Sequence, residues 1–182
     1  MRTKLKKWKK MSSRIVYNNR YFTIFHDKVK LPDGRLYNYY LNHKKGRAVT
    51  ILPIDKKRRI LLAKEFRYPI GKVIYNSVGG GVRKNETPLH AAKRELKEET
   101  GYTASQFIFL GNFYSNPGRA GTIFYAYLAR GLKDGKSEPE HAEFLELEFL
   151  SPSKVAEMIK KGKIKEPFLM SAFLLYKLKM IN

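Results

Sequence analysis

The 182-residue sequence has no cysteine and few acidic residues. The lack of cysteine excludes disulfide bonds, thiolate metal sites and cysteine nucleophiles, and it suits a reducing compartment. Asp and Glu number 16 against 37 Lys and Arg, which gives a formal net charge of +21. Such a field attracts anions such as nucleotides, RNA or acidic lipids, although a lysine-rich composition explains the charge equally well.

Hydrophobic runs that could span a membrane are also missing, since a transmembrane helix needs roughly 20 apolar residues. The first residues, MRTKLKKWKK, have the positive charge that begins a signal peptide, but no apolar segment or small-residue cleavage site follows them. We therefore expect a cytoplasmic protein without a membrane span, in which residues 1–12 form a basic, disordered tail. Translation starting at Met11 would leave most of this tail out.

The apolar and aromatic contents, 43% and 13%, indicate a globular chain. Residues 13–45 are expected to form a small N-terminal β unit, because apolar and polar residues alternate on either side of the turn Pro32-Asp33-Gly34. Two apolar runs within residues 47–69 flank a charged turn at residues 55–59. This pattern predicts a second hairpin.

Residues 46–182 are expected to form the main domain, an α/β fold of the α+β type with a mixed sheet covered by helices. Two strands are predicted within residues 106–130, and another in the alternating segment EFLELEFL. Two helices are predicted at residues 153–161 and 167–179. The residues of the second helix that we expect to face the core are Leu169, Phe173 and Leu174.

The clearest helix signals lie between Thr87 and Gly101. Thr87 can cap the N-terminus of a helix, Pro88 suits its first turn, and Gly101 suits the left-handed position after its end. The sequence therefore predicts both ends of this helix.

Three glutamates of this helix, Glu95, Glu98 and Glu99, have the spacing i, i+3 and i+4, which places them on one face. Like charges at this spacing repel one another, and Arg94 alone cannot neutralise them. A hard divalent cation that prefers oxygen ligands, Mg²⁺ or Mn²⁺, can do so. A solvated, ion-paired surface helix is the alternative explanation.

The spacing of the surrounding residues favours the metal site. The segment runs Gly80-x5-Glu86-x7-Arg94-Glu95-Leu96-x-Glu98-Glu99-x-Gly101-Tyr102, a match expected by chance about once per billion starting points. This pattern resembles the signature of the Nudix hydrolase family, whose members cleave nucleoside diphosphates linked to another moiety. Tyr102 stands where an aliphatic residue is usual in that family.

The resemblance extends over roughly residues 46–180 and implies a Nudix-like α/β/α sandwich that binds Mg²⁺, with Mn²⁺ as an alternative. It implies that Glu95 and Glu99 are metal ligands, that Glu98 shares this role in catalysis, and that the Gly79 carbonyl is a further ligand. The cations would neutralise a pyrophosphate and activate a water molecule for attack on phosphorus.

The remaining residues of the motif have structural roles by the same resemblance. Glu86 would pair with Arg94 and hold the loop against the helix. Gly80 would let the backbone approach phosphate and metal closely, and Gly101 would end the helix.

A general base would complete the site. In the Nudix group that hydrolyses ADP-ribose and nucleotide sugars, the base lies on a flexible loop, which corresponds here to GLKDGKSEPEHAEFLE. The candidates are Glu140 and Glu143, with Glu138 as a third. Glu143 is alternatively a metal ligand.

Several substrate-side residues resemble the same group. Arg67 stands where the group has an arginine that grips the substrate phosphate, and Pro117 and Gly118 match its characteristic turn. Asn76-Ser77-Val78 replaces the group's Glu and Pro-Ala, and the acid that commonly follows the turn is replaced near Thr122. The N-terminal unit of this group mediates a domain-swapped dimer and supplies an aromatic side chain for stacking on the base, so we expect a homodimer. The candidates for stacking are Phe22, Tyr37 and Tyr39.

These features predict Mg²⁺-dependent hydrolysis of ADP-ribose or another nucleoside diphosphate sugar to a nucleoside monophosphate and a sugar phosphate. An RNA 5′-end pyrophosphohydrolase is the alternative, because the chain is basic and Trp8 lies among lysines. A non-catalytic binding module that kept the fold is a third hypothesis. The histidines, which lack the spacing of metal ligands, are His26, His43, His90 and His141.

Overall fold

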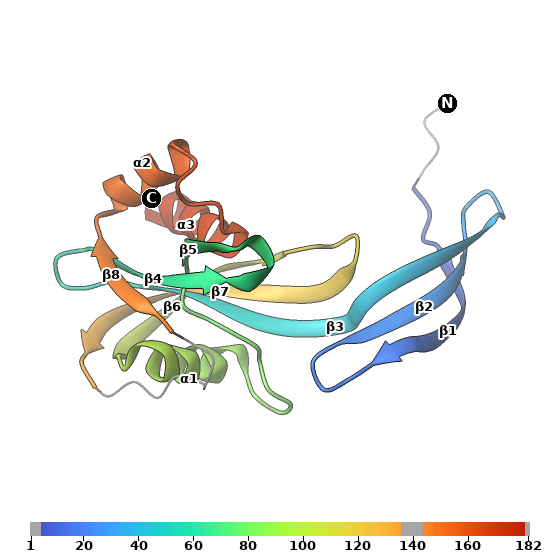
Figure 1. The fold of residues 1–182 in the computed structure, drawn as a ribbon, viewed down its shortest axis with the longest axis horizontal. Coiled ribbons are helices and arrows are strands. Elements are labelled where there is room, and N and C mark those ends of the chain that lie inside the picture. The colour runs from blue at the N-terminus through green and yellow to red at the C-terminus, as the bar shows by residue number, and fades with distance from the viewer. Residues whose placement is uncertain (1–4, 136–143, 181–182) are drawn as a thin grey trace. The chain divides into compact units, whose positions relative to one another are not determined.

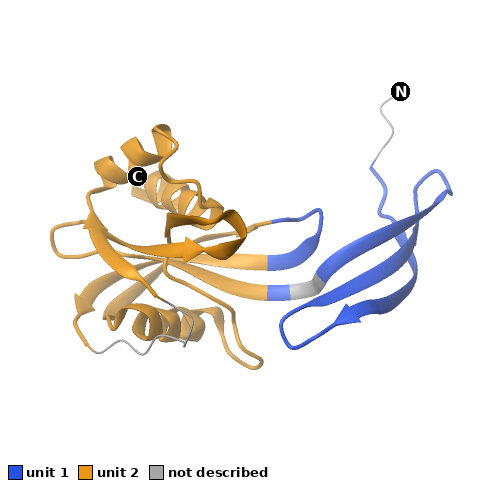
Figure 2. Ribbon diagram, viewed as in Figure 1, with its two compact units in different colours: residues 1–46, 116–122 blue, residues 47–115, 123–182 orange. Residues whose placement is uncertain are grey.

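The computed structural model describes residues 5–135 and 144–180, without the side chains of residues 43–45. The chain divides into two compact units, which Figure 2 distinguishes by colour. Unit 1 comprises residues 1–46 and 116–122, and unit 2 comprises residues 47–115 and 123–182.

Unit 1 is a sheet in which β1 (Lys9–Asn18), β2 (Thr23–Lys30) and the first part of β3 (Leu36–Pro53) are neighbours in that order. Both strand pairs are antiparallel, and β2 and β3 form the predicted hairpin. At its turn Gly34 has a φ of 91°, a conformation that favours glycine, and its N–H donates to the Leu31 carbonyl.

The start of β1 differs from the expectation that residues 1–12 form a disordered tail. The strand begins at Lys9, which lies opposite Lys30 of β2. All ten residues of β1 are exposed, so main-chain pairing with β2, not burial, holds this segment in a strand. An alternation of polar and apolar side chains could not reveal that pairing.

Unit 2 contains two groups of paired strands. The second part of β3 is followed by β7 (Ala120–Lys133) and then by β6 (Thr103–Tyr114), and β6 and β7 are antiparallel. In a separate sheet, β4 (Ile60–Arg67) lies between β5 (Lys72–Asn76) and β8 (Glu146–Leu150), and both pairs are antiparallel.

Helices cover the strands of unit 2 on two sides (Figure 1). One side carries α1 (Pro88–Thr100), and the other carries α2 (Pro152–Lys160) and α3 (Pro167–Met180). A 3-10 helix, Tyr68–Ile70, connects β4 to β5. The predicted α/β fold with an N-terminal β unit is therefore confirmed. None of the helices in the described ranges is long and apolar enough to cross a membrane.

The second part of β3 is buried on both faces, which explains its nearly continuous apolar sequence. Val49 and Ile51 pack in one core cluster with residues of α1, whereas Leu52 and Ile54 pack in another with residues of α2 and α3. Successive side chains of a strand point to opposite faces. β3 therefore anchors both helical layers of unit 2.

The predicted second hairpin within residues 47–69 is wrong. β3 and β4 belong to different sheets, and among the described residues the two segments are joined by a single bridge between Ile54 and Ile60. The charged turn between them is closed by Asp55, whose carboxylate accepts hydrogen bonds at 2.8 Å from the backbone N–H and the Nε of Arg59. The same kind of turn can connect two paired strands or two strands of different sheets, so the turn residues alone did not distinguish these cases.

One predicted core residue of α3 is also wrong. Leu169 and Phe173 are buried as expected, but Leu174 is 59% exposed. The buried residues Leu169, Ala172, Phe173 and Tyr176 follow the spacing i, i+3, i+4 and i+7. Leu174 follows Phe173 directly and is rotated by about 100° from that stripe.

This difference can be measured with two matched substitutions. Leu169→Ala should lower the free energy of unfolding by about 2–5 kcal/mol, because it leaves a cavity in the core. Leu174→Ala should change it by less than about 0.5 kcal/mol, because the side chain is largely exposed. Urea unfolding monitored by circular dichroism measures both values, and equal losses would contradict the assigned face of α3.

Candidate functional site

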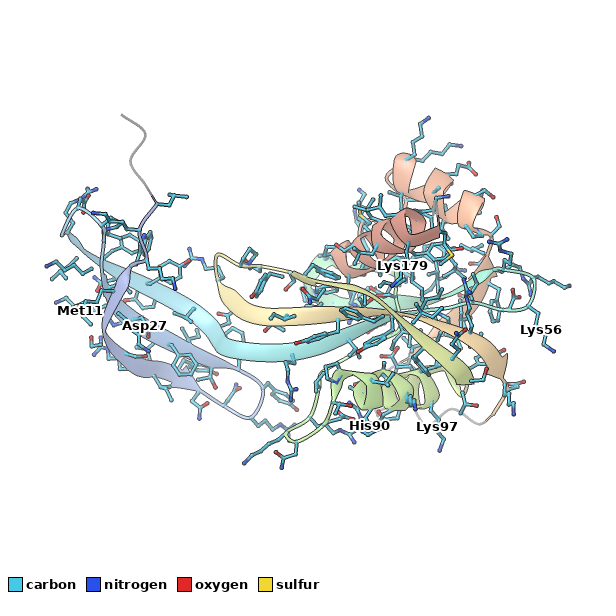
Figure 3. All side chains as sticks on the ribbon, turned by 180° about the vertical axis from the view of Figure 1, so that it is seen from behind. Met11, Asp27, Lys56, His90, Lys97 and Lys179 are labelled. Atoms are coloured by element: carbon cyan, nitrogen blue, oxygen red, sulfur yellow. The ribbon has the colours of Figure 1, made fainter. Side chains whose placement is uncertain are left out.

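Helix α1 carries the acidic residues of the site and is anchored at both ends. The Thr87 hydroxyl accepts a hydrogen bond of 3.2 Å from the backbone N–H of His90, and Gly101 has a φ of 75° with its N–H bonded to the Lys97 carbonyl. Both predicted helix signals are therefore correct. Leu96 is fully buried against the strands, whereas His90 and Lys97 lie on the outer side of the helix (Figure 3).

The glycine turn, residues 79–81, lies between β3 and α1. The Val49 N–H donates to the Gly80 carbonyl and the Ile51 N–H donates to the Val78 carbonyl, at 2.9 and 2.7 Å. Gly79 has a φ of +150°, and a Cβ at this position would collide with the Val49 carbonyl oxygen. Glycine is therefore required for this close approach of two backbones.

Two of the predicted metal ligands approach this turn. The Gly79 N–H lies 3.3 Å from Glu99 Oε2, and a Cβ on Gly80 would lie 2.5 Å from Glu95 Oε1. Because the carbonyls of Val78 and Gly80 both accept bonds from β3, the intervening Gly79 carbonyl points away from that strand. The structure thus brings Glu95, Glu99 and Gly79 together.

Arg94 links the neighbouring acids. Its Nη1 donates to Glu95 Oε1 at 2.7 Å and to Glu98 Oε2 at 2.8 Å. Its Nε donates to Glu86 at 3.0 Å, and its Nη2 donates to the Gly81 carbonyl at 2.9 Å. The hydrogen bond from Arg94, together with one from the Arg83 backbone N–H, holds the pKa of Glu86 below its ordinary value. Arg94 therefore joins the helix to the loop before it, as well as screening the repulsion between two carboxylates.

These residues provide the oxygen donors that a hard divalent cation prefers. Glu95 and Glu99 both approach the backbone of the glycine turn, where no side chain stands in the way. The Nη1 atom of Arg94 contacts both Glu95 and Glu98. Among the described residues no three acidic or histidine side chains are arranged as a complete metal site. The carboxylate of Glu98 is held by Arg94 and lies 3.4 Å from Arg83. Arg94 also contacts Glu95, at 2.7 Å, but Glu95 and Glu99 are the carboxylates that reach the glycine turn, so these two and the Gly79 carbonyl are the donor set that fits a cation there.

A cavity of about 270 Å³ adjoins the glycine turn. Arg67 lines it together with the turn, as its expected role in gripping phosphate requires, and its guanidinium also pairs with Glu65 at 3.0 Å. The cavity is also lined by residues from four other segments. These are Ala48, Val49, Thr50, Asn76, Ser77, Phe124, Glu166 and Phe168.

Glu166 was not among the site residues predicted from the sequence. Its carboxylate is buried in the wall of the cavity and accepts hydrogen bonds from the backbone N–H groups of Phe168 and Leu169, at 2.9 and 2.6 Å. Burial raises the pKa of this carboxyl above its ordinary value, although backbone hydrogen bonds from Phe168, Leu169 and Ser77 and the charge of Arg67 oppose that rise. The one available signal was an acid directly before Pro167 at the start of a predicted helix, which is a weak indication of a cap.

The remaining predicted substrate-side residues belong to unit 1. Tyr39 donates a 2.5 Å hydrogen bond from its hydroxyl to the Gly118 carbonyl, which fastens the turn containing Pro117. Trp8 lies edge-on to both Tyr37 and Tyr39, with ring centroids 6.1 Å apart in each pair. The candidate bases Glu138, Glu140 and Glu143, together with His141, lie outside the described residues.

Comparisons with known proteins match both parts of the chain. A family model described as the NUDIX domain matches residues 44–171, and one described as the nucleoside diphosphate sugar hydrolase N-terminal domain matches residues 8–42. A solved structure described as that of an ADP compounds hydrolase has a TM-score of 0.88 at 22% identity, covering 97% of this chain and 96% of the other. This likeness supports the fold.

The relatives with similar sequences are named for different activities. The ADP-ribose pyrophosphatase of Bacillus subtilis (strain 168) is 31% identical over 141 residues, 76% of each chain. The methanol dehydrogenase activator of Bacillus methanolicus is 31% identical over 163 residues, 88% of each chain. The GDP-mannose pyrophosphatase of Escherichia coli (strain K12) is 28% identical over 168 residues, covering 83% of this chain and 85% of the other.

The contact between Arg94 and Glu86 should make stability depend on pH. Because the pKa of Glu86 is lower in the folded protein, its contribution is complete above the unfolded value of about 4.3 and is lost as the pH falls through the folded value. Glu86→Gln should lower the free energy of unfolding by about 1–3 kcal/mol at pH 7. The difference from the wild type should shrink below about pH 4. Urea unfolding across this range measures it, and a difference independent of pH would contradict the pairing.

Proposed function

Since the chain belongs to the Nudix hydrolase family and begins with the N-terminal domain of nucleoside diphosphate sugar hydrolases, we propose that it hydrolyses the pyrophosphate bond of ADP-ribose or a nucleoside diphosphate hexose. The products would be a nucleoside monophosphate and a sugar phosphate. The observation that supports the reaction most strongly is the meeting of Glu95 and Glu99 at the Gly79–Gly80 backbone. The pyrophosphatases among the relatives support the same reaction class.

The proposed metal ligands are Glu95, Glu99 and the Gly79 carbonyl oxygen, with Glu98 in a supporting role beside Arg94. A bound Mg²⁺ or Mn²⁺ supplies charge neutralisation at the pyrophosphate and lowers the pKa of the attacking water. Arg94 keeps the loop and α1 together while the acids serve the cation. Arg67, at the wall of the adjoining cavity, holds a substrate phosphate.

Glu140 or Glu143, in the segment of sequence between β7 and β8, would accept the proton of the attacking water. A carboxylate in this position serves as general base when it reaches the water directly or through one further water molecule. Substitution of each glutamate in turn distinguishes the two.

We also propose that unit 1 forms a homodimer and that Tyr37 or Tyr39 stacks on the substrate base. β1 lies at the end of its sheet, so it presents main-chain groups that a second copy can pair with. Tyr37 is 49% exposed, so much of its ring remains accessible despite its contact with Trp8.

The proposed metal ligands lead to a direct test of turnover. Glu99→Gln should lower kcat by more than about 100-fold with Mg²⁺ and ADP-ribose or GDP-mannose, because the cation loses a charged ligand while the side chain keeps its size. Glu157→Gln, which makes the same change on the exposed surface of α2, should leave kcat unchanged.

Release of phosphate monoesters from a panel of nucleoside diphosphate sugars measures both variants. Wild-type protein that turned over no member of the panel would contradict the proposed function. Unchanged turnover by Glu99→Gln would contradict the assignment of that residue alone.

A second candidate function, action on RNA 5′ ends, is favoured by one observation in unit 1. Its sequence contains fourteen Lys and Arg against two Asp, a net charge of +12. The strand register places Lys9, Arg14, Lys28 and Lys30 on one face, where Lys9 lies directly opposite Lys30. Like charges opposite each other are destabilising, and a polyanion would relieve that repulsion.

If this face binds RNA, affinity for a 5′-triphosphate RNA should fall steeply between 50 and 200 mM salt, roughly as the number of phosphate contacts dictates. Lys28→Ala combined with Lys30→Ala should reduce the slope by about two counterions, whereas Lys56→Ala combined with Lys57→Ala, at an exposed turn of unit 2, should not. Fluorescence anisotropy measures the slopes. Affinity that is weak and independent of salt would exclude this function.

A further inference from the structure

Helix α3 has apolar side chains on a side that the described residues of unit 2 leave uncovered. Residues 167–176 include no charged residue, and Leu169 and Phe173 are buried in the core. On another side of the same helix Met170 is 38% exposed and Leu174 is 59% exposed. A helix that is apolar all round is normally buried all round. The exposed side of α3 is therefore a candidate contact surface.

This side of α3 forms one wall of a groove, and α2 forms the other. The groove has a volume of about 540 Å³, within the usual range of roughly 300–1,000 Å³ for binding pockets. The two helices lie on the side of the strands that α1 does not cover (Figure 1). The apolar residues that line the groove are Ala156, Ile159, Met170, Phe173 and Leu174.

Each wall of this groove also carries one lysine. Lys160 stands on α2 and Lys177 on α3, and both side chains are exposed without an ion-pair partner among the described residues. Glu157 of α2 does not neutralise them, because its carboxylate pairs with Lys154 at 3.1 Å and with Lys161 at 2.7 Å. The groove is therefore apolar inside and positive on both walls.

The surroundings of the groove have the same charge. Residues 152–180 include seven lysines and two glutamates, one of which is the buried Glu166. A second copy of the chain would bring an equally positive pair of helices to this surface, and the two would repel each other. The charge therefore favours an acidic partner.

The shape of the groove favours a helix over a membrane surface. An amphipathic helix can lay its apolar face between two helices, and charges on both flanks of such a face select the partner in coiled coils. A bilayer would meet the exposed Leu174 and the lysines first and would leave the floor of the groove unfilled. A single helix can fill the floor and reach the lysines of both walls.

We propose that the groove between α2 and α3 binds an amphipathic helix of another protein, whose apolar face has Asp or Glu on both flanks. Leu174 and Ile159 contact the apolar face, and Lys160 and Lys177 pair with the flanking carboxylates. The interaction does not depend on the proposed hydrolysis, because α1 and its acids lie on the other side of the strands.

A synthetic helix of about 18 residues, roughly 27 Å long, is a suitable probe. It has leucine at the a and d positions of each heptad, glutamate at the e and g positions, and a fluorescein label. A second peptide has lysine in place of each glutamate. In fluorescence anisotropy the acidic peptide should saturate one site per chain, and the basic peptide should bind at least about 10-fold more weakly.

Two exposed leucines of α3 test the position of the site. Leu174→Ala should raise the Kd of the acidic peptide by about 10-fold or more, because it removes an apolar contact inside the groove. Leu178→Ala is the matched control, since Leu178 is 56% exposed on the same helix but does not line the groove. It should change the Kd by less than about 2-fold.

Two double substitutions test the charges. Lys160→Glu combined with Lys177→Glu should raise the Kd by about 10-fold or more, because the flanking carboxylates then face like charges. Lys56→Glu combined with Lys57→Glu makes the same change of net charge at an exposed turn of unit 2. It should change the Kd by less than about 2-fold.

Several results would overturn the helix site. Equal effects of the two leucine variants, or of the two charge reversals, would mean that the acidic peptide binds the basic chain without a defined site. An acidic peptide that did not saturate would contradict the proposal directly. If vesicles containing phosphatidylserine bound in its place and Leu174→Ala abolished that binding, the groove would face a membrane. If Leu174→Ala instead dissociated a dimer, a second copy would be the occupant.

Discussion

Several carboxylates of α1 and the loop before it lie close together, and the guanidinium of Arg94 lowers the repulsion between them. It contacts Glu86, Glu95 and Glu98 and also the Gly81 carbonyl, so a single side chain joins the glycine turn, the loop after it and the acidic face of α1. Without this cation, adjacent carboxylates would separate or take up protons. The contacts of Glu95 and Glu99 with the turn depend on the position that Arg94 gives to the helix.

The packing of β3 and α1 also holds the acidic side chains near the glycine turn. β3 is buried on both faces, and its backbone receives the glycine turn through the Gly80 and Val78 carbonyls. Leu96 fixes α1 against the same layer, so the helix cannot rotate its acids away from the turn without exposing apolar surface. The same turn also lines the cavity with Arg67 and Glu166. The proposed metal ligands of α1 and the proposed phosphate-binding Arg67 would therefore meet at the same glycine turn.

The sequence predicted the parts of this structure that depend on local rules. The ends of α1 follow from Thr87 and Gly101, and the acidic face follows from the spacing of its glutamates. It did not predict that residues 47–69 cross between two sheets, because alternation reports burial and not the strand's partner. Nor did it predict that Glu166 lines a cavity, because that cavity is built by five separate segments of the chain. Contacts between segments that are far apart in the chain could not be predicted from this single sequence.

The central claim is that Glu95, Glu99 and the Gly79 carbonyl bind a divalent cation beside the substrate's pyrophosphate. The most direct test is an anomalous difference map from crystals of the protein grown with Mn²⁺ and a non-hydrolysable ADP-ribose analogue. The account predicts a manganese peak in contact with these three groups, with Arg94 still bonded to Glu86. A peak bound elsewhere, or a pyrophosphate held there while Glu95 and Glu99 touch no metal, would contradict it.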